Sequence, residues 1–246
     1  EFLLFCNPDT VVSQDSISTC VAFLQQHADA GMVGPKILDP KGRLQRTCRR
    51  SFPTPFNIFC HISGLSALFP HSRRFGGYKL TWLDDETATE VDAISGSFMF
   101  VRASTFSAIN GFDESFFMYG EDLDLCARIR AAGSKVWYLP STQIVHFKGR
   151  SSAKQPLRSQ IAFYEATVLF SRKYRNSYGS FFPPWLIYLG IVIRTAMHLG
   201  ASVVKSYFAC FTDMLIVNLL LWVSITLRFT LLDPASAYYG MNPYFG

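Results

Sequence analysis

The sequence predicts an α/β protein in which a mixed sheet is flanked by helices, followed by a strongly apolar helical part. Short apolar runs typical of strands alternate with helix-like segments as far as residue 147. Glycine-containing or polar turns follow several of these runs. From residue 176 to residue 193 there is no charged side chain. We therefore expect one domain over residues 1–175 and two hydrophobic, membrane-associated helices with a short tail over residues 176–246.

The first part of the chain predicts a strand, a helix and a second strand. The chain opens directly inside an apolar run, so we expect the sheet to be incomplete at its N-terminal side. Ser13 is a suitable N-cap for the helix. The predicted elements are a strand at 2–6, a helix at 14–27, a strand at 31–38, a turn at 39–42 and a hairpin at 43–48.

The middle of the chain predicts a long excursion and then a return to strands and helices. Residues 49–90 mix proline, aromatic and arginine residues, and we expect them to pass, partly helical, over the active face. The later predicted elements are a strand at 91–101 broken at Ser95-Gly96-Ser97, helices at 103–109 and 121–132, strands at 136–139 and 143–147, and a helix at 156–175.

The apolar end of the chain predicts two helices joined near Lys205. Two membrane-spanning helices, two helices at the membrane interface, and a buried soluble pair are the three interpretations. Arg172, Lys173 and Arg175 precede the first segment, which favours the cytoplasmic face of the membrane for the α/β domain.

Charge and cysteine usage exclude some classes of function. The net charge is +5, without long basic runs, so nucleic-acid binding is not expected. The six cysteines form no Cys-x-x-Cys pair and match no zinc spacing. We interpret them as reduced, buried thiols in a cytosolic compartment.

The helix at 121–132 carries the most informative chemistry. Asp122 is in line with the inward apolar stripe, whereas Glu121 and Asp124 lie on neighbouring faces. An acidic helix start with an Asp124–Arg128 surface pair explains the two outer acids but not Asp122. An ionised carboxylate directed into a pocket is what a general base requires.

Other polar groups follow strands. Asp9, in Asn7-Pro8-Asp9, can bind a divalent cation, although this tripeptide is also a common turn. His146 ends a strand and precedes Lys148 and Arg150, which suit a phosphate neighbourhood. The glycine in Ser95-Gly96-Ser97 permits close approach of a ligand or another backbone, or marks a β-bulge.

Four stretches share their motifs and spacing with one enzyme family: LLFCNPDT (3–10), GMVGPKILDPKGRLQRTCRRSFPTP (31–55), ISGSFMFVRASTFSAINGFDESFFMYGEDLDLCARIRAAG (94–133) and VWYLPSTQIVHFKGRSS (136–152). In them the chain resembles the family 2 glycosyltransferases, and within those the rhamnosyltransferase-like branch. The resemblance implies a GT-A fold, a nucleotide-diphosphate sugar and Mg²⁺ or Mn²⁺.

The resemblance also implies roles for single residues. Asp122 matches the catalytic base, with Glu121 beside it. Asp9 matches the last acid of the DxD metal motif, and His146 matches a histidine that completes the metal site in some relatives. Asn7 replaces the first acid of that motif, as a weaker ligand or a supporting residue. The remaining candidate substrate contacts, beside Asn7, are Ser95, Gly96, Ser97, Lys148 and Arg150.

The implied reaction is the inverting, metal-dependent transfer of a sugar to a hydroxyl of a lipid-linked glycan in cell-surface polysaccharide biosynthesis. Rhamnose is the sugar that the resemblance suggests. The family's first nucleotide-binding strands are missing, so we expect this chain alone to be inactive. A metal-dependent phosphodiesterase or nucleotidyltransferase, and a non-catalytic membrane-anchored glycan-binding scaffold, are the alternatives.

Overall fold

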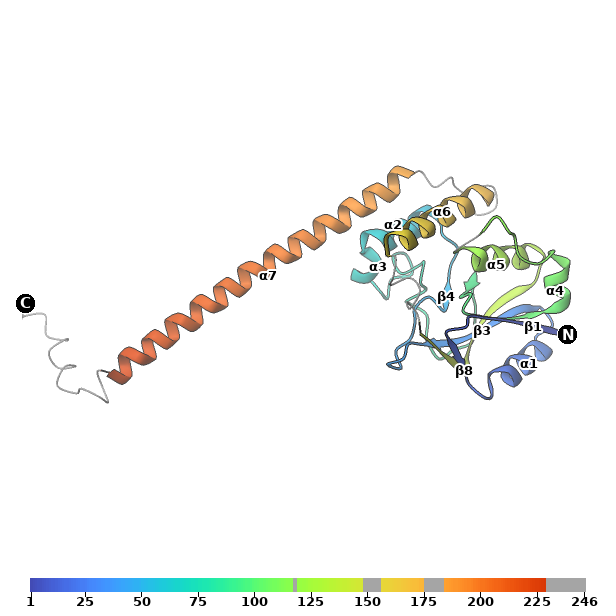
Figure 1. Ribbon diagram of the computed structural model, residues 1–246, viewed down its shortest axis with the longest axis horizontal. Helices are drawn as coiled ribbons and strands as arrows, with labels where there is room; N and C mark the ends of the chain where they lie inside the picture. Colours follow the sequence, from blue (N-terminus) through green and yellow to red (C-terminus); the bar gives the residue numbers. More distant parts are fainter. Residues whose placement is uncertain (117–118, 148–155, 175–183, 229–246) are drawn as a thin grey trace, which may run out of the picture. The chain divides into compact units, whose positions relative to one another are not determined.

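The structure is a computed structural model that describes residues 1–116, 119–147, 156–174 and 184–228. A mixed sheet of six strands lies at its centre (Figure 1). The strands of this sheet are β1 (Phe2–Cys6), β2 (Thr10–Val12), β3 (Ala30–Leu38), β5 (Thr89–Glu90), β7 (Phe98–Arg102) and β8 (Lys135–His146). The helices are α1 (Ser16–Gln26), α2 (Pro55–Ser63), α3 (Leu65–Leu68), α4 (Ala103–Ala108), α5 (Glu121–Ala131), α6 (Pro156–Lys173) and α7 (Pro184–Leu227). Strands β4 (Arg49–Arg50) and β6 (Ala93–Ile94) form a separate antiparallel pair.

The strand order brings distant polar segments to one edge of the sheet. The order is β1-β7-β3-β8-β2, with β5 added beside β8, and only β3 and β8 run parallel. Cys6 at the end of β1 lies opposite Phe98 at the start of β7. Thr10 in β2 lies opposite His146 at the end of β8. The residues that follow β1, precede β7 and end β8 therefore meet.

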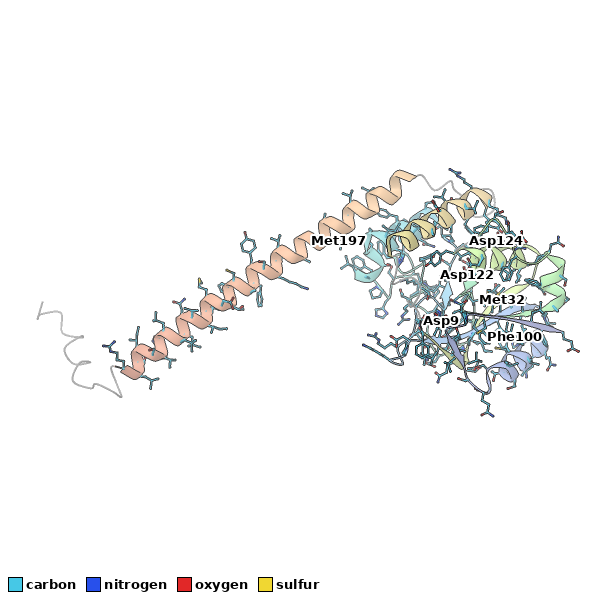
Figure 2. The ribbon with its side chains drawn as sticks, viewed as in Figure 1. Asp9, Met32, Phe100, Asp122, Asp124 and Met197 are labelled. Carbon is cyan, nitrogen blue, oxygen red and sulfur yellow. The ribbon has the colours of Figure 1, made fainter. Side chains whose placement is uncertain are left out.

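The core fills both faces of the sheet. On one face, α1 packs Cys20 and Leu24, both fully buried, against β3 and β8. The other face is covered by α5 (Figure 1), in which Leu125 and Ile129 are fully buried. Met32, with Phe100 in β7, is buried in the sheet between these helices (Figure 2). The prediction of a mixed sheet flanked by helices is confirmed.

Two local predictions in the first part of the chain are wrong. Ser13 does not cap α1, because its hydroxyl donates to the Gln143 carbonyl at 2.6 Å. The expected hairpin at 43–48 is reduced to a single bridge between Leu38 and Leu44. Within this segment, the Gln45 side chain bonds to the sheet, as described below.

The prediction of two C-terminal helices is also wrong, because α7 is one continuous helix of 44 residues. Lys205 makes the helix surface locally polar, but a lysine does not interrupt the backbone hydrogen bonds of a helix. No proline, which would interrupt them, follows Pro184 within α7. Within α7, Val203–Leu227 is long and apolar enough to cross a membrane. The predicted domain boundary at residue 175 remains a prediction.

The cysteines agree with the interpretation of free thiols. All six are unpaired with one another, and Cys20, Cys48, Cys60 and Cys126 are buried, but Cys6 and Cys210 are exposed, contrary to the burial predicted for them. Burial raises the pKa of Cys126 to about 12, which keeps this thiol protonated.

Candidate active site

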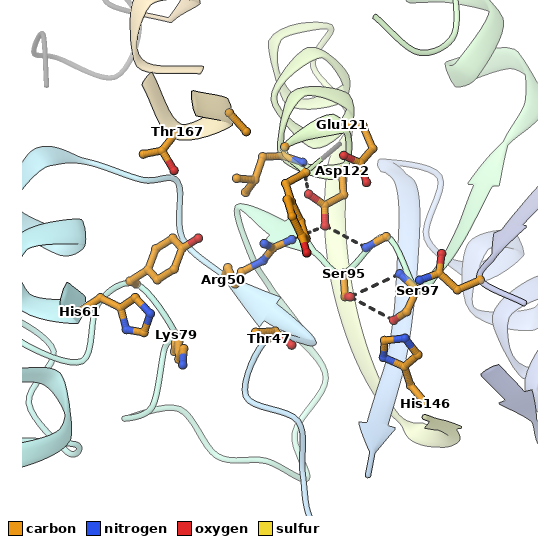
Figure 3. Close-up of a pocket in the computed structure, with 17 residues that line it drawn as sticks. Thr47, Arg50, His61, Lys79, Ser95, Ser97, Glu121, Asp122, His146 and Thr167 are labelled. Atoms are coloured by element: carbon orange, nitrogen blue, oxygen red, sulfur yellow. Dashed lines mark hydrogen bonds and ion pairs between the residues drawn. The ribbon is translucent and has the colours of Figure 1, made fainter. Parts of the chain in front are cut away.

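A cavity of about 430 Å³ opens where the polar strand ends meet α5. Such a volume is within the range of small-molecule sites. In Figure 3, His61 and Lys79 lie across the cavity from Ser97 and His146. The lining residues are Asn7, Thr47, Arg50, His61, Tyr78, Lys79, Ser95, Gly96, Ser97, Tyr119, Gly120, Glu121, Asp122, Leu123, His146, Ala166 and Thr167.

Asp122 is held at the cavity wall by three donors. The Arg50 guanidinium and the Gly96 amide, at 2.9 Å, both donate to Asp122 Oδ2 (Figure 3). The Leu123 amide donates to Oδ1 at 2.8 Å. Asp122 is 9% exposed and lines the cavity, so little of its side chain faces bulk water. This arrangement fixes the orientation of a carboxylate that has access to a bound molecule.

Local backbone geometry explains how Asp122 reaches this place. A Cβ at position 96 would lie 3.3 Å from the Asp122 Cβ, so glycine permits the close approach of α5. The close approach expected at Gly96 is thus made by a side chain of α5. Tyr119 and Gly120, just before α5, have φ angles of 66° and 84°. Tyr119 therefore holds a left-handed conformation that costs a side-chain-bearing residue about 1–2 kcal/mol, and it lines the cavity.

Glu121 also lines the cavity but has different surroundings. Its Oε2 atom is buried and has no hydrogen-bond partner among the residues that the structure describes. Burial, with a smaller contribution from the charge of Asp122, raises the pKa of Glu121. The two adjacent carboxylates are therefore not equivalent, and only Asp122 is surrounded by donors.

Asp124 is buried, contrary to the surface pair predicted for it. Its side chain is 1% exposed and accepts hydrogen bonds from Arg128 at 2.7 Å and Lys173 at 2.5 Å. The Tyr174 hydroxyl donates to it at 2.7 Å. Lys173, one of the basic residues noted before the apolar segment, joins the end of α6 to α5. Asp124 thus has a structural role.

A second polar cluster forms where β1, β2 and β8 meet. The Asn7 amide donates to the Ser97 carbonyl at 3.1 Å, and the Phe147 amide donates to the Asp9 carbonyl at 2.9 Å. These bonds hold the Asn7-Pro8-Asp9 turn against β7 and β8. His146 Nε2 lies 3.3 Å from Asp9 Oδ1. Asp9 itself does not line the cavity, but it contacts His146, which does.

Gln45 determines the orientation of His146. Its side-chain amide donates to the Leu38 carbonyl at 3.3 Å and to the His146 carbonyl at 2.6 Å. This leaves Gln45 Oε1 to accept from His146 Nδ1 at 3.1 Å, which assigns the proton to Nδ1. Nε2 is then the nitrogen that faces Asp9.

Asp9 and His146 suit a divalent cation that is also bound by a substrate. Adjacent ligands of an octahedral Mg²⁺ or Mn²⁺ lie about 3 Å apart, close to the 3.3 Å between His146 Nε2 and Asp9 Oδ1. A histidine whose other nitrogen is hydrogen-bonded is the usual form of a metal ligand. No group of three His, Cys, Asp or Glu side chains suited to a metal ion occurs in the described parts of the chain. Asp9 and His146 are thus a pair of candidate ligands and not a complete metal site within those parts.

The structure brings most of the predicted site residues together. Asn7, Gly96, Glu121 and Asp122 line the cavity, as do Ser95, Ser97 and His146. Lys148 and Arg150 lie outside the described residues. The sequence interpretation missed Gln45, Arg50 and Lys79, although the excursion that carries two of them was expected over the active face. Arg50 reaches Asp122 across 72 positions, a pairing with no local signal.

Comparison with known proteins identifies related sequences. A family model described as glycosyl transferase family group 2 matches residues 4–240. The chain is 27% identical over 206 residues to the N-acetylglucosaminyl-diphospho-decaprenol L-rhamnosyltransferase of Mycobacterium tuberculosis, covering 84% of this chain and 66% of that protein. It is 31% identical over 150 residues to the rhamnosyltransferase WbbL of Escherichia coli K12, covering 60% of this chain and 52% of that protein.

The chain thus spans 66% of one curated relative and 52% of the other. Among solved structures, it is similar to the crystal structure of GalNAc-T7 with UDP, GalNAc and Mn²⁺, with a TM-score of 0.46 and 13% identity. This match covers 74% of the present chain and 33% of the other. At that distance the likeness carries no functional assignment.

Proposed function

The chain belongs to glycosyl transferase family group 2, and from this premise we propose that the protein transfers a sugar from a nucleotide-diphosphate donor to a hydroxyl of a lipid-linked glycan. Relatives named as rhamnosyltransferases support rhamnose as the donor sugar. The observation that carries the proposal is the cavity, which gathers Asp122, the Ser95–Ser97 turn and His146 from distant parts of the sequence.

Asp122 is the proposed general base. The acceptor hydroxyl gives its proton to Asp122 as its oxygen forms a bond to the anomeric carbon. The bond between that carbon and the phosphate oxygen breaks, and the nucleoside diphosphate leaves with the electron pair. A single displacement of this kind inverts the anomeric centre. The Arg50 and Gly96 donors support this role, because they hold the carboxylate in one orientation.

Asp9 and His146 are the proposed ligands of a divalent cation. The cation would supply positive charge for the departing diphosphate. The backbone of Asp9 is held by its bond to Phe147 and the His146 ring by Gln45, which supports a pair of neighbouring side chains that are in place before a substrate binds. Asn7, which follows β1 beside Ser97, is the proposed neighbouring contact of the donor.

The reaction is proposed to take place at a membrane, to which α7 attaches the protein. The Val203–Leu227 segment rises about 37 Å at 1.5 Å per residue, enough for a hydrocarbon core of about 30 Å. We place the site-bearing domain at the cytoplasmic face, where nucleotide sugars are supplied. A lipid-linked acceptor would then be available in the same membrane.

The test is a donor screen with membranes from cells that express the complete open reading frame. Labelled nucleotide-diphosphate sugars are added with and without Mn²⁺, and label is measured in the lipid extract. We expect label to enter the lipid fraction from one donor only when Mn²⁺ is present, and an Asp9→Asn variant to lose it. Asp15→Asn, which changes an exposed acid on the same domain, is the matched control.

Two outcomes would overturn the proposal. Release of a nucleoside monophosphate without sugar transfer would favour a phosphodiesterase. Binding of glycans with no turnover of any donor would favour a scaffold.

A further inference from the structure

An exposed group of aromatic and basic side chains lies on the excursion between β4 and β5. We call it the aromatic–basic patch and define it as Phe56, Leu68, Phe69, Arg73, Arg74 and Phe75. Three of its apolar members are unusually exposed for their size: Phe56 at 41%, Leu68 at 57% and Phe69 at 50%. Large apolar side chains grouped in this way mark an interaction surface more often than chance exposure.

Ring contacts connect the patch into one surface. The ring centroids of Phe69 and Phe75 are 5.2 Å apart, and those of Phe75 and Phe56 are 6.3 Å apart. The Arg74 guanidinium lies 5.5 Å from the Phe56 ring centroid. Arg73 lies 4.6 Å from the ring of Trp82. The apolar and cationic groups are therefore interleaved rather than separated.

The segment that carries the patch has charged side chains of one sign. Between Arg49 and Leu83 the chain contains no Asp or Glu. The next acid, Asp84, is engaged by the Thr87 hydroxyl at 2.5 Å. Arg73 and Arg74 are exposed, and neither forms an ion pair with any described residue. The patch is thus complementary to an anionic surface.

We propose that the aromatic–basic patch binds the surface of an anionic lipid bilayer. Phe and Leu side chains gain free energy by entering the boundary between headgroups and acyl chains, and each arginine is attracted to anionic lipid headgroups. A protein partner or a second copy would also cover aromatic groups, but neither requires the absence of acids over the whole segment. The bilayer is therefore the occupant that the combined pattern fits best.

The patch has a consequence for the cavity. The same excursion contributes His61 from α2, and Tyr78 and Lys79 from the segment just after Phe75, to the cavity wall. Docking of the patch would hold this wall next to the bilayer, where a lipid-linked hydroxyl is found. This consequence rests on the proposed sugar transfer, whereas lipid binding by the patch does not.

The test uses nitroxide labels on the full chain, in a Cys6→Ser, Cys210→Ser background that leaves only the four buried cysteines. Single labels are placed at Leu68→Cys in the patch, Ile17→Cys on α1 and Leu219→Cys on α7. Collision with a water-soluble nickel complex is compared before and after adding vesicles of phosphatidylethanolamine and phosphatidylglycerol. The label at position 68 is expected to lose most of its nickel accessibility, while that at position 17 keeps it.

The charge of the patch supplies the matched comparison. Arg73→Glu combined with Arg74→Glu, or vesicles of phosphatidylcholine alone, should restore the accessibility at position 68. Unchanged accessibility at position 68 on anionic vesicles would overturn the proposal, whatever the label on α7 reports. If the label at position 68 is already shielded from nickel without vesicles, the patch would be assigned to self-association. If vesicles shield this label equally in the charge-reversed variant, the proposal would also be contradicted. No sugar donor is present in this experiment, so a negative result would overturn lipid binding by the patch without testing sugar transfer.

Discussion

The three acids at the start of α5 have different surroundings although they are close in sequence. Asp122 meets Arg50 and two backbone amides, Asp124 meets Arg128, Lys173 and Tyr174, and Glu121 has a buried oxygen without a described partner. A buried carboxylate costs free energy unless donors compensate it. Asp124 has donors from three side chains. Asp122 has three donors and also lines the cavity, whereas Glu121 has the weakest compensation.

Glu121→Gln tests the weak compensation of Glu121. Because burial raises its pKa in the folded protein, the folded state retains a proton at pH values where the unfolded chain has lost it. The ionised side chain therefore lowers stability above its folded-state pKa. We expect the variant to be more stable than the wild type at neutral pH by about 1 kcal/mol, measured by thermal unfolding in detergent.

The pH dependence distinguishes this cause from a general effect of the substitution. The advantage of Glu121→Gln should shrink as the pH falls through the raised pKa and vanish below the ordinary value of 4.5. Glu114→Gln, at an exposed acid nearby, should show no such trend. An advantage for Glu121→Gln that is independent of pH would contradict the account.

Gln45→Leu tests the orientation of His146. Leucine keeps the size of the side chain but removes the acceptor for His146 Nδ1 and the donors to two carbonyls. Loss of such supporting bonds typically weakens metal affinity about 10–100-fold. We expect this weakening in Mn²⁺ binding measured by electron paramagnetic resonance in the presence of a nucleoside diphosphate. Gln25→Leu, at an exposed glutamine of α1, should bind Mn²⁺ as the wild type does, and equal affinity in both variants would refute the role of Gln45.

The local pattern predicted Asp122 but not its partners. Helical spacing alone directs Asp122 toward the core, and that prediction is consistent with its low exposure. The position of Arg50 at the site depends on the pairing of β4 with β6. The position of Gln45 depends on a segment that was expected to form a hairpin. Contacts between segments far apart in sequence leave no periodic signal in either of them.

At the scale of elements, α6 is fixed to α5 through Lys173. This side chain bridges Asp113 and Asp124, at 2.5 Å from each. In addition, Phe170 of α6 stacks on Phe52 with 5.6 Å between the ring centroids. Ala166 and Thr167 of α6 line the cavity, so the position of this helix defines part of the site.

Lys173→Met should loosen this junction. The substitution leaves the buried Asp124 with fewer donors, and we expect a loss of about 2 kcal/mol in the free energy of unfolding. The Lys173 hydrogen bond lowers the pKa of Asp113 below 3.8, so its contribution is complete above that pH and is lost as the pH falls further. The difference from the wild type should therefore shrink in acid, as followed by thermal unfolding at several pH values. Lys41→Met, in an exposed turn, is the control, and an unchanged melting temperature for Lys173→Met would count against the bridge.

The elements show where sequence patterns are sufficient. Strand and helix patterns predicted β1, β3, β7, α4 and α5 closely, because each has a clear apolar period and a distinct end. The two strands predicted at 136–139 and 143–147 are one strand, since β8 continues past a register shift beside Pro35 and Lys36. In α7, the charged Lys205 was interpreted as the junction between two helices, but the backbone continues there as one helix.

At the scale of the whole molecule, the chain divides into the compact units Glu1–Val192 and Ile193–Gly246. The first contains the sheet and the cavity. The second contains the Val203–Leu227 segment, whose large apolar side chains are exposed in the absence of lipid. We propose that this segment inserts into a membrane, where lipid covers these apolar side chains.

A double substitution tests this insertion. Ile216→Lys with Leu220→Lys places two charges four residues apart on one side of α7, at positions that are 55% and 62% exposed. Each charge near the centre of a membrane helix costs about 3 kcal/mol. The variant should be released from membranes by alkaline carbonate, while the wild type and Val11→Lys remain bound. Retention of the double variant would exclude α7 as the anchor.

The central claim is tested most directly by Asp122→Asn in the complete open reading frame, with donor binding and sugar transfer measured on the same preparation. Asparagine keeps the shape of the side chain but accepts no proton. We predict that Mn²⁺-dependent binding of the nucleotide sugar is retained while transfer falls about 10³-fold, and that Asp15→Asn changes neither. Transfer by Asp122→Asn at the wild-type rate would contradict the assignment of this cavity as the site of sugar transfer.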